Sequence, residues 1–170
     1  MNLNQHIVLI GMPGVGKTEI GKSLSKIMGV QYIDIDYNIE IKESQAINEI
    51  INKRGEEVFR AIEKKEFDLA ICGNESSVIS TGAGVILDAE NRLIIKNRTM
   101  GIHIKSSIKE IANRIDVFNR PLLYNTNKKK MLLDLWNERN YFYQESCKLE
   151  VDISSLSLKE SIEKVYSKIL

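Results

Sequence analysis

The chain has 170 residues, which corresponds to about one compact domain. Its 24 Lys and Arg stand against 23 Asp and Glu, so the large basic excess that is typical of nucleic-acid-binding proteins is absent. Hydrophobic residues make up 43% of the chain and charged residues 28%, which is ordinary for a globular domain and excludes a disordered chain.

The sequence also indicates in which part of the cell the protein works. No segment approaches the ~20 consecutive apolar residues that cross a bilayer, and residues 1–6 lack the basic-then-apolar layout of a signal peptide. Cys72 and Cys147 lie far apart, and two isolated histidines offer no metal-ligand spacing. We therefore expect a cytoplasmic monomer that binds small molecules, with neither a nucleic-acid nor a membrane partner.

Short apolar runs alternate along the chain with longer segments of helical spacing. In chain order, the pattern predicts a strand at 6–10, a helix at 18–28, a strand at 30–35, helical chain in two pieces over 37–53, a helix at 56–71, a strand at 77–80, a helix at 88–97, a strand at 100–104, a helix at 107–114, irregular chain over 118–127, a helix at 128–145, a strand at 149–153 and a helix at 157–170. Strands separated by helices form parallel sheets. We expect one α/β domain over 1–170, with a five-stranded parallel sheet flanked by helices on both faces.

The most specific motif is the run GMPGVGKT at 11–18, which matches G-x-x-x-x-G-K-[ST] between a predicted strand and a predicted helix. Its glycines let backbone N–H groups turn toward phosphate oxygens, and the start of the next helix adds unpaired N–H groups. In this motif the lysine reaches the β- and γ-phosphates and the hydroxyl binds Mg²⁺. We expect ATP with Mg²⁺ to bind at Gly11, Gly14, Val15, Gly16, Lys17, Thr18 and Glu19.

Two further features follow predicted strands, at the edge where parallel sheets bind ligands. Asp34 and Asp36 end the second strand, and residues two apart on a strand face the same side. They could serve Mg²⁺ and a substrate hydroxyl, or they could be solvated acids of a turn. The turn Gly82-Ala83-Gly84 follows the third strand and permits close backbone approach to a ligand.

Arginines supply the remaining candidates. Arg120 precedes Pro121, which holds it extended and could present its guanidinium to a transferring phosphate from a lid. An ordinary loop that ends a helix is the alternative. Arg60 and Arg139 lie within predicted helices, and each taken singly is more typical of a solvated pair with a neighbouring glutamate.

In this order and spacing the motifs resemble shikimate kinase, a P-loop family of the nucleoside-monophosphate-kinase type. The resemblance covers about residues 6–153. It is carried by GMPGVGKT, YIDIDYNIE at 32–40, EEVFRAIE at 56–63, NRPLL at 119–123 and the late pair Arg139-x-x-x-Tyr143.

This resemblance implies a three-layer P-loop α/β/α fold with a substrate-binding helical region at about 37–63 and a lid at about 113–127. It implies ATP-dependent phosphorylation of the 3-hydroxyl of shikimate, giving 3-phosphoshikimate and ADP, in the synthesis of aromatic amino acids. Lys17, Asp36 and Arg120 would be catalytic, with Arg120 also contacting ATP. Asp34 would support, through water, the Mg²⁺ that Thr18 binds.

The resemblance also assigns the acceptor pocket. Asp36 would hold the acceptor hydroxyl, while Arg60 and Arg139 would grip the shikimate carboxylate as forked donors. Glu63 would hold Arg60 in place. The turn Gly82-Ala83-Gly84 would give backbone contacts to shikimate.

This chain departs from the family pattern at three places. Ala83 stands where the family usually has glycine, Arg114 lies one place out of register for a second lid arginine, and no arginine after the last strand is assigned to the adenine. Two alternatives stay open: a related kinase for another small hydroxy acid or polyol, and a non-catalytic nucleotide-binding module. Retention of the whole set of acceptor residues argues against the module, which would need only the phosphate loop.

Overall fold

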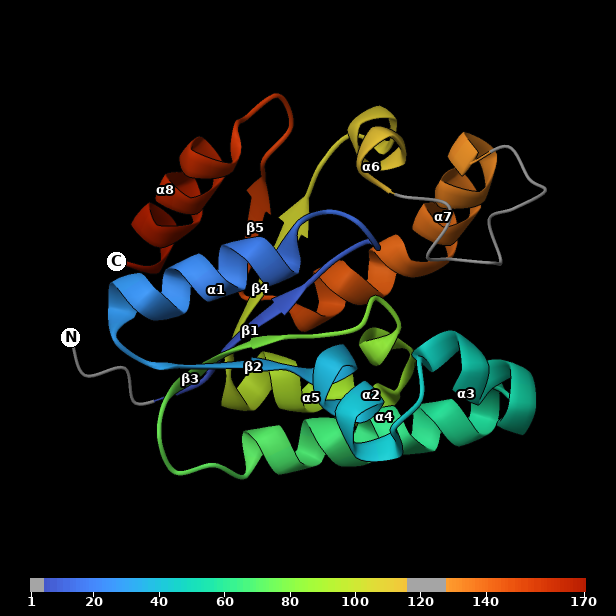
Figure 1. Cartoon of the computed structure of the whole chain (residues 1–170). Coiled ribbons are helices and arrows are strands. Elements are labelled where there is room, and N and C mark those ends of the chain that lie inside the picture. The colour runs from blue at the N-terminus through green and yellow to red at the C-terminus, as the bar shows by residue number, and fades with distance from the viewer. Residues whose placement is uncertain (1–4, 116–127) are drawn as a thin grey trace.

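A five-stranded parallel sheet lies between layers of helices in the computed structural model, which describes residues 5–115 and 128–170 (Figure 1). The strand order is β2-β3-β1-β4-β5. The strands are β1 (Ile7–Ile10), β2 (Gln31–Asp34), β3 (Ser77–Ser80), β4 (Met100–Lys105) and β5 (Leu149–Asp152). The predicted α/β sheet with five parallel strands is therefore confirmed.

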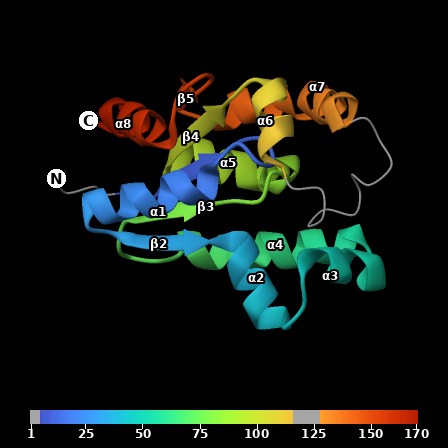
Figure 2. The ribbon, with the colours of Figure 1, turned by 45° about the horizontal axis from the view of Figure 1, so that its top comes forward.

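Helices cover both faces of this sheet (Figures 1 and 2). On one face α1 (Lys17–Met28) contacts α8 (Leu158–Ile169), and on the other α5 (Ala89–Arg98) contacts α7 (Lys128–Ser146). Three helices pack against one another beyond the edge strand β2: α2 (Ile35–Glu43), α3 (Ile47–Arg54) and α4 (Glu56–Ile71). A short 3₁₀ helix, η1 (Val85–Leu87), follows the turn after β3, and α6 (Ile108–Arg114) follows β4.

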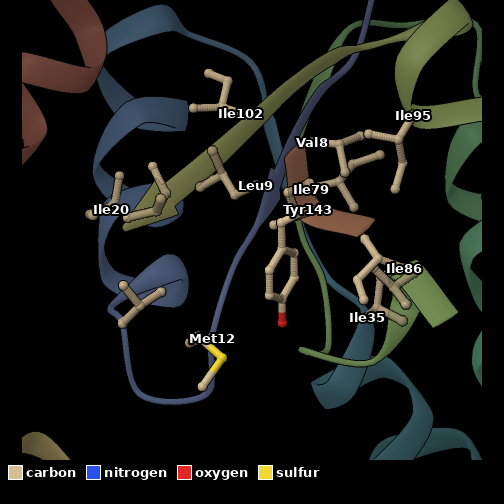
Figure 3. Packing of buried hydrophobic residues seen from close by; sticks show 14 of the residues in the cluster. Val8, Leu9, Met12, Ile20, Ile35, Ile79, Ile86, Ile95, Ile102 and Tyr143 are labelled. Carbon is tan, nitrogen blue, oxygen red and sulfur yellow. The ribbon is translucent and has the colours of Figure 1, made fainter. Parts of the chain in front are cut away.

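The core lies on both sides of the central strand β1. All four residues of β1 are at most 1% exposed, because β3 and β4 pair with its edges and helices cover both of its faces. A strand that is buried on both faces has a continuously apolar sequence, which in β1 is IVLI. Figure 3 shows Val8 and Leu9 among side chains from neighbouring strands and helices, including Ile79, Ile102 and Ile20.

The second strand is shorter than the sequence pattern predicts. It ends at Asp34, whose side chain accepts a hydrogen bond from the Tyr37 N–H at 3.2 Å and so caps α2. Asp36 therefore lies in the first turn of α2, and the expectation that both acids share one face of a strand is wrong. The cap favours an immediate turn into helix, which places Asp36 over the end of the sheet.

Two segments, 107–110 and 157–160, have the Ser-x-x-Glu pattern of a capping box, but only one of them forms the complete box. Ser157 and Glu160 form both halves of the box at the start of α8. At α6, Ser107 accepts from the Glu110 N–H, but the Glu110 carboxylate instead accepts from Ser106 Oγ and Ser155 N. Glu110 thereby ties α6 to the loop after β5, and only half of the box forms.

Among the described residues, none of the helices is both long enough and apolar enough to span a membrane. The irregular segment predicted at 118–127, and the predicted lid beyond residue 115, lie outside the described residues.

Candidate active site

A cleft of about 720 Å³ opens at the carboxyl ends of β1, β2 and β3. Its walls come from the phosphate loop, α2, α3, α4, the turn after β3, and α7. Thirteen of the residues assigned from the sequence line this one cleft: Gly14, Gly16, Lys17, Thr18, Glu19, Asp34, Asp36, Arg60, Glu63, Gly82, Ala83, Gly84 and Arg139.

The phosphate loop forms one end of the cleft. Gly14 and Gly16 have φ values of 74° and 108°, a region that side chains disfavour, and α1 begins directly after them. The first N–H groups of α1 donate to no side chain of the N-cap residue Gly16, so they are available to an anion. The Lys17 ammonium donates to the carbonyls of Gly11 and Met12 at 2.8 and 3.1 Å, which holds it above the loop.

A hydroxyl and a carboxylate meet beside this loop. Thr18 Oγ1 donates to Asp34 Oδ2 at 3.1 Å, and the Tyr32 hydroxyl donates to the same oxygen at 2.8 Å. Burial raises the pKa of Tyr32, so its hydroxyl stays a protonated donor. Asp34 is therefore fixed in place by two hydroxyls and by its role as the cap of α2.

The donor set at this point suits a hard cation. The Thr18 hydroxyl donates a hydrogen bond to Asp34, and its lone pairs stay available to a metal ion. No cluster of three or more His, Cys, Asp or Glu occurs among residues 5–115 and 128–170. Mg²⁺ matches this pattern, because it usually takes one or two protein oxygens and completes its shell with water and phosphates.

The acceptor end of the cleft is built on the turn after β3. A Cβ on residue 82 would lie 2.5 Å from Glu63 Oε1 and 2.7 Å from Asp36 Oδ1, so a side chain there would displace these carboxylates. A Cβ on residue 84 would overlap the Arg60 guanidinium and displace it. Ala83 stands between them and carries its methyl group, so the outer two positions, and not the central one, are those where a side chain would disturb the cleft.

Arg60 is held between two glutamates of its own helix. It bonds to Glu63 at 2.7 Å and to Glu56 at 2.9 Å, and its side chain is 29% exposed. Burial disfavours its charge, but the two carboxylates outweigh burial and raise the pKa of Arg60. The local ion pairs expected for Arg60 are present, yet the side chain faces the cleft and is not a solvated surface pair.

Glu63 and Arg139 complete this electrostatic cluster. Burial raises the pKa of the Glu63 carboxyl, while Arg60 and Arg139 act against that rise. The Arg139 side chain is only 13% exposed, and its Nε lies 3.5 Å from Glu138 Oε1. Two guanidinium groups from different helices therefore converge on one buried carboxylate at the end of the cleft.

Sequence reasoning assigned no role to several residues that the structure brings to this cleft. Glu40 Oε1 accepts from the Ile47 N–H at 3.0 Å and so holds the start of α3, which otherwise lacks a side-chain cap. Arg114 does not line the cleft, but its Nη1 donates to the Val15 carbonyl of the phosphate loop at 3.4 Å. The spacing of Ile47 and Ile51, one turn apart, could have indicated the apolar wall, whose members are Ile47, Ile51, Phe59, Met131, Leu132 and Leu135.

One assigned residue is not placed. Arg120 lies outside the described residues, so the geometry above neither includes nor excludes it. Gly11 and Val15 are buried within the phosphate loop and do not line the cleft, whereas the other assigned residues line it from the loop to the two arginines.

A glycine-rich phosphate loop at the start of a helix, joined by one cleft to an acid and an arginine pair, defines a small-molecule kinase of the P-loop class. The chain belongs to the shikimate kinase family, since the shikimate kinase family model matches residues 13–170.

Individual relatives agree with this assignment. The shikimate kinase of Clostridium botulinum (strain Alaska E43 / Type E3) is 36% identical over 163 residues, which cover 96% of each chain. The bifunctional shikimate kinase/3-dehydroquinate synthase of Thermotoga maritima is 36% identical over 140 residues, 82% of this chain and 27% of that protein. The structure of shikimate kinase from Acinetobacter baumannii in complex with shikimate superposes with a TM-score of 0.92 at 28% identity, covering 99% of this chain and 94% of that one.

Proposed function

We propose that this protein transfers the γ-phosphoryl group of ATP to the 3-hydroxyl of shikimate, giving 3-phosphoshikimate and ADP. The observation that carries the proposal is the single cleft in which the phosphate loop, Asp36 and the pair Arg60 and Arg139 face one another. Family membership and the shikimate-bound neighbour support the same acceptor.

On the ATP side, backbone N–H groups of the loop and of α1 would hold the phosphates, and Lys17 would swing from its carbonyl partners to the β- and γ-phosphates. Thr18 would bind Mg²⁺ directly, and Asp34 would hold one of its waters. The metal supplies neutralisation of phosphate charge when bound.

On the acceptor side, two forked guanidinium groups match the two oxygens of a carboxylate. Arg60 is pre-positioned by Glu56 and Glu63, so little rotamer entropy is lost when the substrate binds. Asp36, in the first turn of α2, would accept the hydrogen bond of the attacking hydroxyl and orient its oxygen toward the γ-phosphate. Catalysis would then consist mainly of positioning and charge neutralisation.

The lid is the remaining element of the proposal. We assign Arg120 to the transferring phosphoryl group on the family resemblance alone, with residues 113–127 closing over ATP to exclude water. Phosphoryl transfer to an alcohol needs this exclusion because water would compete as acceptor.

A coupled assay of ADP release tests the proposal. Purified protein with ATP and Mg²⁺ is offered shikimate, gluconate or a nucleoside monophosphate in parallel. We expect turnover that depends on shikimate and saturates with it. Turnover only with one of the rival acceptors, or ATP binding without turnover on any, would overturn the assignment.

The Asp36→Asn variant tests the role of the acid. We expect it to bind ATP as the parent does and to lose at least about 10²-fold in kcat, the usual scale for a positioned acid or base. Asp134→Asn, which changes an exposed acid on α7, is the matched control. Parent-like kcat in Asp36→Asn would refute the assigned role.

A further inference from the structure

Tyr143 is a buried tyrosine that the proposed mechanism does not use. It lies on α7, is 0% exposed, and its hydroxyl donates to the Ala83 carbonyl at 2.7 Å. Its ring stacks on His103 of β4 with centroids 4.8 Å apart. Figure 3 shows this ring in the core with its hydroxyl directed away from Val8 and Ile79.

The carbonyl that Tyr143 holds belongs to the turn beneath the acceptor groups. Gly82 supports Asp36 and Glu63, and Gly84 supports the Arg60 guanidinium, each too closely for a Cβ. A shift of the Ala83 peptide would move both glycines and therefore the floor under three side chains of the cleft. The hydrogen bond from Tyr143 fixes that peptide from below.

Tyr143 also neighbours the second arginine. Arg139 lies four residues earlier, on the same face of α7, and opposes the rise that burial causes in the pKa of Tyr143. Burial keeps the pKa of Tyr143 raised despite Arg139, so the hydroxyl stays a donor to the Ala83 carbonyl. Arg92 also links the segment after this turn to α7. It donates to the carbonyls of Ile86 and Leu87 and pairs with Glu145 of α7 at 2.9 Å.

We propose that Tyr143 is a positioning residue for the acceptor half of the cleft: its hydroxyl ties the 82–84 turn to α7, the helix that also carries Arg139. This inference rests on the proposed function. It separates Tyr143 from an ordinary core aromatic, because the ring alone would fill the core as phenylalanine does. The hydrogen bond that this hydroxyl makes within the described residues goes to the 82–84 turn and not to the phosphate loop, so its loss should change the kinetics of shikimate and not those of ATP.

The test compares Tyr143→Phe with Tyr141→Phe, a control on the same helix whose side chain is 68% exposed. Initial rates are measured with shikimate and ATP varied separately, after circular dichroism has established folding. We expect Tyr143→Phe to raise KM for shikimate, so that kcat/KM for shikimate falls roughly tenfold, the effect of one lost hydrogen bond on positioning, with KM for ATP within about twofold of the parent. A merely structural role predicts a smaller active fraction, which lowers kcat and leaves both KM values unchanged.

Hydrogen exchange provides a second measurement that does not depend on the identity of the acceptor. We expect faster exchange of the amides of 82–84 in Tyr143→Phe, with those of 14–18 unchanged. Unchanged exchange at 82–84, or an equal rise of both KM values, would overturn the inference. If the parent shows no turnover with shikimate but the exchange difference is present, the proposed function fails and the positioning role stands.

Discussion

Substitution of Gly84 by alanine isolates the contact between the acceptor turn and Arg60. The new methyl group would lie 2.6 Å from both Cζ and Nη2 of Arg60 and closer still to Nη1, whereas ordinary van der Waals contact begins at 3.4 Å. Because close-packed atoms cannot overlap, the guanidinium must retreat by more than about 0.8 Å or leave its position. A misplacement of ~1 Å at a reacting or positioning group costs on the order of 10²-fold in rate.

We therefore expect Gly84→Ala to lower kcat/KM for shikimate about 10²-fold while KM for ATP stays near the parent value. The measurement is a pair of saturation curves in the ADP-release assay. Gly73→Ala is the matched control, because a Cβ there meets its nearest atoms at 3.6 Å, an ordinary contact. Parent-like kcat/KM for shikimate in Gly84→Ala would refute the reasoning, and so would an equal loss of affinity for ATP.

Two further predictions concern stability. Glu40→Ala removes the acceptor that holds the Ile47 N–H at the start of α3, and we expect a loss of about 1 kcal/mol in the free energy of unfolding and a raised KM for shikimate. Glu40→Gln keeps an acceptor oxygen, and urea denaturation should place it near the parent; equal losses in both variants would contradict the capping role. Burial lowers the pKa of His103 to about 4, below its ordinary value of 6.5, so the unfolded chain takes up the proton first as the pH falls. The contribution of His103 to the free energy of unfolding is full above pH 6.5 and is lost between about pH 6.5 and 4, by about 2 kcal/mol from pH 7 to pH 5. Urea denaturation of His103→Gln should show a correspondingly smaller pH dependence of stability. An unchanged pH dependence would contradict this role of His103.

The phosphate loop shows what a contiguous stretch of sequence can determine. Its glycines, Lys17 and the start of α1 are neighbours along the chain, so backbone preferences alone place them together. The same holds for Arg60 and Glu63, which are three residues apart and meet on one face of α4. The strands were also predictable, because buried parallel strands leave short apolar runs bounded by turns.

Asp36 shows where local pattern reasoning fails. An alternation of apolar and acidic residues over 32–36 is compatible with a strand, and the competing signal is the ability of Asp34 to cap a helix. The hydrogen bond to the Tyr37 N–H decides between the two. The sequence pattern therefore identifies Asp34 and Asp36 as candidates but does not predict how they lie relative to each other.

The sequence by itself determined the class of fold, the nucleotide loop and, through family resemblance, the identities of the acceptor residues. Only the tertiary structure decided which side chains a Cβ on Gly82 or Gly84 would displace, and that Tyr143 reaches Ala83 across 60 positions of the chain. Such contacts depend on how α4 and α7 pack against the end of the sheet, and neither periodicity nor capping determines the relative placement of helices so far apart in sequence. The phosphate loop can therefore be predicted from local backbone preferences, whereas the acceptor pocket forms only when the helices pack together.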